Sequence, residues 1–230
     1  MNKTKIEWTE YTWNPVTGCK HGCPYCYARK LTTRFPANFP NGFEPKFHKS
    51  RLNEPCQIGK PAKIFTVSMG DLFGAWVPYE WQEAVFKVIS SNPAHTFQIL
   101  TKDPHHASIA LLRYFNKIPK NLWIGTSVES AAAKTRIAWL PPREYGGVRF
   151  VSFEPLLEDI GEVDLSNIDW VIIGAQTNPT KQPEPTWVRN LIGQARHHGA
   201  AVFLKDSIQS WWTNTIREYP EQPIIGAVRQ

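Results

Sequence analysis

Three of the four cysteines of this chain, Cys19, Cys23 and Cys26, fall within one short segment, and Cys56 stands apart from them. Thiolates are soft ligands for iron and zinc, and pairs of thiols also form disulfides or exchange electrons. Three neighbouring thiols are one more than a disulfide needs and one fewer than a closed tetrahedral zinc site needs. The chemistry of the segment therefore depends on what the third thiol does.

Three familiar uses of cysteine explain the segment poorly. The N-terminal stretch has no apolar core segment and no cleavage site, so we expect a cytoplasmic chain, where disulfides are rare. A thioredoxin-like pair, Cys23 and Cys26, leaves the remaining thiol unexplained. A structural zinc site would take Cys56, His21 or His48 as its fourth ligand, but such sites usually contain two closely spaced ligand pairs.

A fourth interpretation is a [4Fe–4S] cluster held by three thiolates. The spacing C-x3-C-x2-C lets one loop reach three corners of a cuboidal cluster. Gly18 and Gly22 can adopt unusual dihedral angles there, and Pro24 stiffens the turn. The fourth iron then has no protein ligand, and an open coordination position is a catalytic feature because a small molecule can bind to it.

The elements that position this loop alternate regularly after residue 60. Short β-branched or aromatic runs predict six buried strands, at residues 63–68, 96–101, 122–128, 148–153, 170–175 and 201–205. Apolar stripes at helical spacing lie between strands, one over residues 81–89 and another over residues 188–195. This alternation predicts an α/β fold with a parallel sheet, either a barrel or an open doubly wound sheet.

Polar or charged side chains follow every predicted strand. They include Asp71, Lys102, Glu129, Glu154, Gln176 and Lys205. The carboxyl ends of parallel strands meet at one edge, where α/β proteins place their sites. Part of this pattern has a simpler explanation, because every strand must eventually reach water. We favour the functional interpretation for the set as a whole.

The excess positive charge is local. The chain has a net charge of +6, and residues 28–63 hold eight Lys or Arg against two Glu, which accounts for all of it. The Pro-rich part of this segment, residues 35–62, reads as a basic insertion in which four phenylalanines alternate with cations. Such a pattern grips single-stranded nucleic acid. The alternative, slightly favoured, is that the aromatic rings fix a long loop against the sheet.

The cysteine motif, with Tyr25 just before the last cysteine, resembles the signature of the radical S-adenosylmethionine (radical SAM) superfamily, which follows a first strand. Here it follows "YTWNPV", residues 11–16. The similarity extends over nearly the whole chain, through stretches such as "IFTVSMGDLF" and "FVSFEPLLEDIG", to a small group of phage- and prokaryote-encoded radical SAM proteins. These relatives typically read Gly-Gly-Glu-Ser-Gly where residues 174–178 are Gly-Ala-Gln-Thr-Asn, a departure that concerns the substrate pocket.

The resemblance implies a partial (βα) TIM-like barrel of about six parallel strands. It also implies a [4Fe–4S] cluster and S-adenosylmethionine (SAM) as cofactors, and an external one-electron reductant of flavodoxin or ferredoxin type. In such proteins an electron from the cluster cleaves SAM to a 5′-deoxyadenosyl radical, which abstracts hydrogen from the substrate. The implied metal ligands are Cys19, Cys23 and Cys26.

Roles for other residues also follow from the resemblance. The implied cofactor-binding residues are Tyr25 over the adenine, Gly70 and Asp71 near the SAM amino group, and Ser127 and Glu129 near the ribose or carboxylate. The residues expected around the substrate are Lys102, Glu154, Gln176 and Lys205. Asp71 could equally be a helix N-cap, Glu129 a first-turn residue of a helix, and the Lys and Glu side chains a structural salt bridge.

We therefore expect one domain, residues 1–230, that contains the insertion at 35–62 and no membrane span. The expected activity is that of a radical SAM enzyme on an unidentified substrate, with a nucleic-acid base or nucleotide ranked first. Two alternatives stay open. One is a zinc-stabilised module that binds nucleic acid without catalysis, and the other is a redox or sensor protein whose cluster does not cleave SAM.

Overall fold

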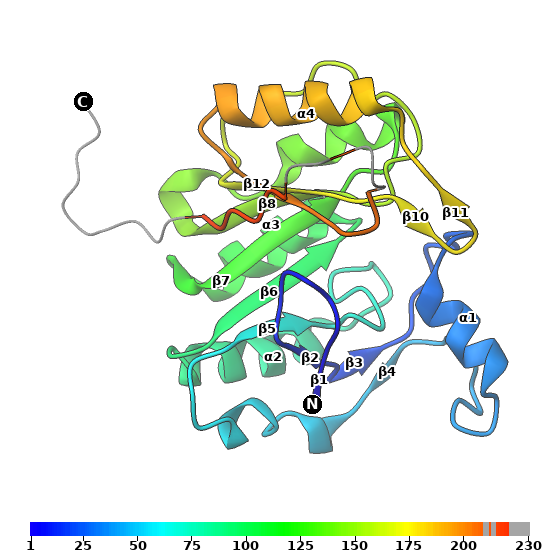
Figure 1. The fold of residues 1–230 in the computed structure, drawn as a ribbon. Coiled ribbons are helices and arrows are strands. Elements are labelled where there is room, and N and C mark those ends of the chain that lie inside the picture. The colour runs from blue at the N-terminus through cyan, green and yellow to red at the C-terminus, as the bar shows by residue number, and fades with distance from the viewer. Residues whose placement is uncertain (209–211, 213–214, 221–230) are drawn as a thin grey trace.

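The computed structural model of the chain describes residues 1–208, 212 and 215–220. Its strands are β1 Asn2–Lys3, β2 Tyr11–Trp13, β3 Val16–Thr17, β4 Lys46–Phe47, β5 Lys63–Thr66, β6 Thr96–Thr101, β7 Ile118–Ser127, β8 Gly146–Phe153, β9 Trp170–Ile173, β10 Gln176–Thr177, β11 Thr180–Lys181 and β12 Ala201–Leu204 (Figure 1). Its α-helices are α1 Tyr27–Arg34, α2 Tyr79–Ser91, α3 Pro104–Tyr114 and α4 Pro185–His197, and its 3-10 helices are η1 Lys49–Arg51, η2 Pro55–Gln57, η3 Ala131–Trp139 and η4 Arg143–Tyr145. The last part of the expected 1–230 domain, residues 221–230, lies outside the described residues.

Eight strands form the central sheet, in the order β1-β2-β5-β6-β7-β8-β9-β12. β1 pairs antiparallel with β2, and every other neighbouring pair is parallel. The mixed α/β class with a mostly parallel sheet is therefore confirmed, and the six predicted strands correspond to β5, β6, β7, β8, β9 and β12. The sheet is not closed, since β1 and β12 are its edges, and the partial TIM-like barrel stays a prediction.

The strand expected at "YTWNPV" is shorter than its apolar run. β2 ends at Trp13 because Asn14 and Pro15 follow, and a proline has no amide hydrogen to donate to a neighbouring strand. The segment then turns into β3, which pairs with β4 of the basic insertion. The insertion is thereby joined to the segment that leads into the cysteine loop.

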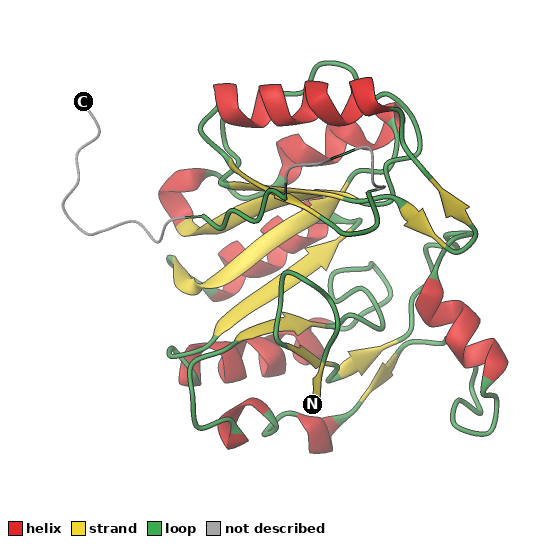
Figure 2. Ribbon diagram, viewed as in Figure 1, coloured by secondary structure: helices red, strands yellow, loops and turns green. Residues whose placement is uncertain are grey.

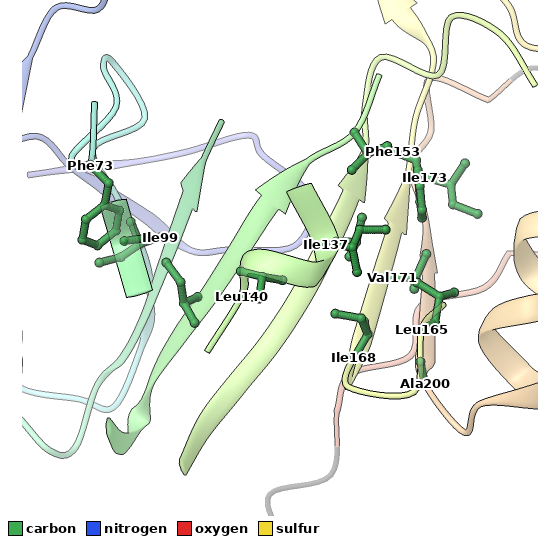
Figure 3. Packing of buried hydrophobic residues seen from close by; sticks show 14 of the residues in the cluster. Phe73, Ile99, Ile137, Leu140, Phe153, Leu165, Ile168, Val171, Ile173 and Ala200 are labelled. Carbon is green, nitrogen blue, oxygen red and sulfur yellow. The ribbon is translucent and has the colours of Figure 1, made fainter. Parts of the chain in front are cut away.

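One face of the sheet packs against the helices. Along each strand alternate side chains such as Ile99, Val171 and Ile173 enter this core (Figure 3). The predicted apolar stripes are the buried faces of α2 and α4, and in α4 the buried residues are Val188, Leu191, Ile192 and Ala195. Figures 1 and 2 show these helices on the side of the sheet away from the N-terminal segment.

The other face of the sheet carries an aromatic cluster at its amino-terminal half. Its buried members are Trp8, Trp123, Val148, Phe150, Trp170, Ile172 and Phe203. Gly125 makes room for it, because a Cβ there would lie 2.6 Å from the ring of Phe150. Three of the ten tryptophans of the chain therefore pack on this face of the sheet. In the described part of the chain, no helix is long and apolar enough to cross a membrane.

Candidate functional site

The cysteine loop begins directly after β3, which pairs with β4 outside the central sheet. The loop is held against the end of β5 in the central sheet. The amide of Gly18 donates a hydrogen bond to the carbonyl oxygen of Met69 at 2.8 Å. A Cβ on Gly70 would lie 2.8 Å from the carbonyl oxygen of Gly18, and a Cβ on Gly18, whose φ is +90°, would lie 2.2 Å from the carbonyl oxygen of Glu44. Both positions therefore require glycine, which fixes where the loop starts.

The three thiols of this loop are free and partly buried. Cys26 is the N-cap of α1, and its Sγ accepts a hydrogen bond from the amide of Arg29 at 3.4 Å. Burial raises the pKa of the Cys19 thiol to about 11, and the neighbouring Asp71, Cys23 and Cys26 contribute to the increase. Cys23 and Cys26 therefore lie near enough to Cys19 to act on its thiol electrostatically.

The described donor set offers no ready-made site for a single metal ion. Within the described residues, no three His, Cys, Asp or Glu side chains converge closely enough to hold one metal ion. A zinc ion needs its ligands to meet at one point, whereas each thiolate of a cuboidal cluster binds a different iron. The two candidate histidines have other partners, because His21 Nε2 lies 2.8 Å from Asp71 Oδ2 and His48 Nε2 lies 2.8 Å from Thr17 Oγ1.

Cys56 lies at the opposite edge of the sheet. It belongs to η2, and the side-chain amide of Asn92 lies 3.5 Å from its Sγ. Asn92 ends α2, which runs back to the start of β6, so it marks the amino edge of the parallel strands. The cysteine loop follows the carboxyl end of β5. The length of the strands therefore separates Cys56 from the other three thiols.

Asp71 is a buried junction between the cysteine loop and two strand ends. Its Oδ1 accepts hydrogen bonds from the Phe73 amide at 3.0 Å and the Thr101 hydroxyl at 2.7 Å. Its Oδ2 lies 2.8 Å from His21 Nε2 and accepts a bond from the Lys102 amide at 2.9 Å. Burial alone would raise the pKa of Asp71, but His21 and the other donors hold it below its ordinary value. Both oxygens are therefore engaged within the protein, which favours a positioning role.

Four of the predicted residues lie on the sheet face that carries the aromatic cluster. Because side chains alternate along a strand, Lys102 follows Leu100 on this face, and Lys205 follows Phe203. The same alternation places Ser127 two residues after Gly125. Glu154, four residues after Phe150, continues the row. The structure therefore brings these positions to one side of the sheet, at its carboxyl edge and above the aromatic cluster.

Lys102 pairs with Glu129, and Tyr25 joins them. The Lys102 ammonium lies 2.8 Å from Glu129 Oε2 and donates to the Tyr25 hydroxyl at 2.8 Å. Arg136 of η3 also contacts Glu129, at 2.9 Å. Burial would raise the pKa of Glu129, but the charges of Lys102 and Arg136 hold it below its ordinary value of 4.5. This group thus contains one predicted substrate residue and two predicted cofactor-binding residues.

Lys205 pairs with Glu154 across an intervening strand. Glu154 follows β8 and Lys205 follows β12, with β9 between them. The two side chains form a salt bridge because Gly174, which follows β9, has no side chain to separate them. A Cβ at Gly174 would lie 3.1 Å from both side chains. The lysine side chain is 14% exposed and the glutamate side chain 25%, so the pair is largely shielded from water.

Gln176 is not brought into either group by any hydrogen bond in the structure's described part. Its amide donates to the Pro179 carbonyl at 2.7 Å, within the β10–β11 hairpin. Ser127 lies at the end of β7, and its carbonyl accepts a bond from Arg136 at 2.8 Å. Sequence reasoning missed Arg136. The only signal in the sequence was that Arg136 is a cation seven residues after Glu129, which follows a predicted strand. The 3-10 helix η3 brings these two side chains together.

Comparison with solved structures identifies a similar fold. A cysteine-substituted variant of spore photoproduct lyase, solved with dinucleoside spore photoproduct, matches with a TM-score of 0.53 at 12% identity. The match covers 89% of this chain and 79% of that chain. Spore photoproduct lyase complexed with dinucleoside spore photoproduct matches over the same shares with a TM-score of 0.51, also at 12% identity. At this level of identity the similarity concerns the fold.

The search of curated proteins found no match. One family model, described as "Protein of unknown function (DUF5131)", matches residues 3–222. Because that match spans nearly the whole chain, the protein belongs to the DUF5131 family.

Proposed function

We propose that this chain is a radical SAM enzyme, related to the phage- and prokaryote-encoded group, in which Cys19, Cys23 and Cys26 hold a [4Fe–4S] cluster. One observation carries the proposal. Three free thiols lie on one glycine-bounded loop at the carboxyl edge of a parallel sheet, with Cys23 and Cys26 near enough to act on the Cys19 thiol, and the fourth cysteine lies at the other edge. The protein thus offers three thiolates for a cluster and leaves one iron for another ligand.

The residues present fit such a cofactor. Cys19 is a neutral thiol at physiological pH, and cluster assembly would remove its proton, since iron binds the thiolate. When bound, the cluster supplies the electron that cleaves SAM reductively and so provides a radical for hydrogen abstraction. Such a protein needs a one-electron reductant of flavodoxin or ferredoxin type and a compartment that keeps thiols reduced, such as the cytoplasm.

The chain's own residues would bind and orient the cofactor. Gly70 brings the strand end next to the loop, and Asp71 holds the loop in place through His21. We therefore assign the backbone at Gly70, rather than the saturated Asp71 carboxylate, to the SAM amino group. Tyr25 and Glu129, with Ser127 beside them, would contact the remainder of SAM. Lys102 keeps Glu129 ionised through their ion pair.

The Glu154–Lys205 pair fits an uncharged polar substrate edge. The pair carries no net charge. It places a hydrogen-bond acceptor, the Glu154 carboxylate, next to a donor, the Lys205 ammonium, at the carboxyl edge of the sheet on the face that carries the aromatic cluster. The amide-like edge of a nucleic-acid base offers the complementary donor and acceptor. The similar fold of lyases solved with a dinucleoside photoproduct supports a base or nucleotide as the substrate. Gln176 would reach this site only by leaving its hairpin contact.

Metal analysis of cysteine variants tests the proposal. Anaerobically purified protein should be brown and contain about four irons and four sulfides per chain. Cys19→Ala, Cys23→Ala and Cys26→Ala should each lose most of this iron. Cys56→Ala is the matched control and should retain it, because Cys56 lies at the other edge of the sheet. One bound zinc without iron, or iron lost on Cys56→Ala, would contradict the proposal.

A further inference from the structure

The basic insertion encloses a hollow beside the cysteine loop that the proposed reaction does not use. Its volume is about 460 Å³, which is within the range of about 300–1,000 Å³ typical of ligand pockets. The insertion forms one wall, from Asn38 to Gly42, together with Leu31 of α1. Strands β2, β3 and β4 form the other, through Thr12, Thr17 and Lys46.

The hollow has cationic side chains in its wall that are not neutralised by an ion pair within the described residues. Its two carboxylates are already paired, Glu44 with Lys20 at 3.2 Å and Glu54 with the amino group of Met1 at 2.6 Å. Lys46 and Arg51 also line it, and neither forms an ion pair with a described residue. Two cationic side chains without carboxylate partners in this part of the chain make the hollow suitable for an anion such as phosphate.

His48 fits the same electrostatic picture. It lines the hollow between Lys46 and Arg51, and its ring nitrogen lies 2.8 Å from the Thr17 hydroxyl. Burial, followed by the charges of Arg51 and Lys46, lowers the pKa of His48. Both cations therefore lie near enough to His48 to act on its ring, and Glu54 opposes them.

A second hollow adjoins the first. Its volume is about 420 Å³, and the two share Phe39, Pro40 and Gly42 in their walls. Arg29 lines the second one, where it lies over the Phe43 ring at 5.2 Å and donates to the Cys19 carbonyl at 2.9 Å. Each hollow therefore has its own cation, and a half-buried aromatic ring lies in the wall that they share.

Phe43 also lines the second hollow, whereas Phe35 and Phe47 have different surroundings. Phe47 stacks on Trp81 of α2 with ring centroids 5.4 Å apart, so it fixes the insertion to the body of the protein. Phe35 is 43% exposed and lines neither hollow. The sequence alone could not separate these cases, because all four rings occur in the same basic, Pro-rich context.

We propose that the two hollows bind two successive nucleotides of a single-stranded nucleic acid, with Phe39 stacked between the bases and Lys46, Arg51 and Arg29 facing the phosphates. Each nucleotide of a single strand has one negatively charged phosphate and one aromatic base. Two adjacent pockets that each contain a cation and share an aromatic side chain are complementary to two such nucleotides. The strand would run past the Cys19 backbone through Arg29 and so reach the proposed catalytic edge. Strand binding does not require SAM cleavage, so each can fail without the other.

Binding of a fluorescein-labelled single-stranded oligonucleotide of about ten nucleotides to the full-length protein, followed by fluorescence anisotropy, tests this inference. Phe39→Ala should weaken binding at least about fivefold, the lower end of the effect of losing one stacked base. Lys46→Gln should lower the slope of log K against log salt by about 0.7, as expected for one lost phosphate contact.

Matched controls come from the same insertion. Phe35→Ala removes an exposed ring that lines neither hollow, and Lys49→Gln removes the same charge as Lys46→Gln from a residue outside both walls. Both should bind within about twofold of the unmodified protein. Circular dichroism and the urea midpoint of each variant identify any that fail to fold.

Three outcomes would overturn the inference. The first is equal weakening by Phe35→Ala and Phe39→Ala, and the second is equal binding of the same sequence as a duplex, whose stacked bases cannot receive Phe39. The third is that the mononucleotide dAMP competes as strongly as the unlabelled oligonucleotide when both are present at the same concentration of nucleotides. This last result would show a site for free nucleotides instead of a strand.

Discussion

At the scale of single residues, Asp71 connects the most parts of the site. One buried carboxylate receives bonds from the cysteine loop, from its own turn and from the end of β6. The positions of His21, Thr101 and Lys102 therefore depend on a residue that contacts no cysteine by hydrogen bond in the described structure. A helix N-cap, the alternative considered from sequence, would have used only one of these bonds.

We expect Asp71→Asn to destabilise the protein by about 2–3 kcal/mol, because an amide nitrogen cannot accept the bonds made to one of the two oxygens. The variant should also lose iron, since His21 no longer holds the cysteine loop. Urea unfolding and iron analysis measure both effects. Asp164→Asn is the matched control. Asp164 is exposed and accepts one local bond from the Ser166 amide, so its loss should cost no more than about 0.5 kcal/mol.

We also expect the stability lost in Asp71→Asn to depend on pH. The pKa of Asp71 lies below its ordinary value of 3.8. A depressed pKa means that the carboxylate stabilises the folded state above pH 3.8 and that this contribution disappears as the pH falls through the lower, folded value. The stability difference between the unmodified protein and Asp71→Asn should therefore shrink only in acid, as the pH falls below 3.8. A difference that shrinks near pH 6 would contradict this assignment.

Sequence patterns identified the charged residues but not their partners. Lys102, Glu154 and Lys205 were recognised because they follow strands, and strand alternation brings them to one face. Their pairing depends on which strands are neighbours. Lys102 meets Glu129 because β6 and β7 are adjacent, whereas Lys205 reaches Glu154 over a strand that ends in glycine. The pattern also did not show that a hairpin begins at Gln176 and takes up its side-chain amide.

At the scale of elements, the contact between Gly18 and Gly70 connects the cysteine loop to the sheet. The two residues form an isolated parallel bridge, which extends the pairing beyond the regular strands. The cysteine spacing alone could not reveal this contact, because Gly70 lies far along the chain. The predicted role of Gly70 rested on resemblance to a family, and the structure supplies a steric reason for glycine at this position.

Gly70→Ala should destabilise the protein by about 1–3 kcal/mol, since its Cβ would lie 2.8 Å from a backbone oxygen that has to move. Iron content should fall with it, because the displaced backbone leads directly into Cys19. Gly193→Ala serves as the opposite case. Gly193 lies within α4 with no atom near its missing Cβ, so alanine should stabilise the helix by about 0.5–1 kcal/mol. Thermal unfolding and iron analysis compare the two, and unchanged iron in Gly70→Ala would contradict the proposed role of the contact.

At the scale of the whole molecule, the parallel sheet keeps the packed apolar side chains apart from the cysteine loop and the charged side chains. Its amino-terminal half is filled by aromatic and aliphatic side chains on both faces, and Cys56 lies at that edge. Its carboxyl edge carries the cysteine loop and both Lys–Glu pairs. The alternation of strands and helices was sufficient to predict this class of fold and the edge at which these side chains meet. The openness of the sheet and the hollows of the insertion depend on tertiary contacts that the pattern does not encode.

The central claim is that three thiolates hold a cluster whose fourth iron is open to SAM. Formation of 5′-deoxyadenosine, after reconstituted protein is incubated with SAM and dithionite, tests it most directly. We predict that the unmodified protein and Cys56→Ala form the nucleoside and that Cys26→Ala does not. No nucleoside from protein whose cluster is shown by electron paramagnetic resonance to be reduced would contradict the claim and indicate a redox or sensor protein instead.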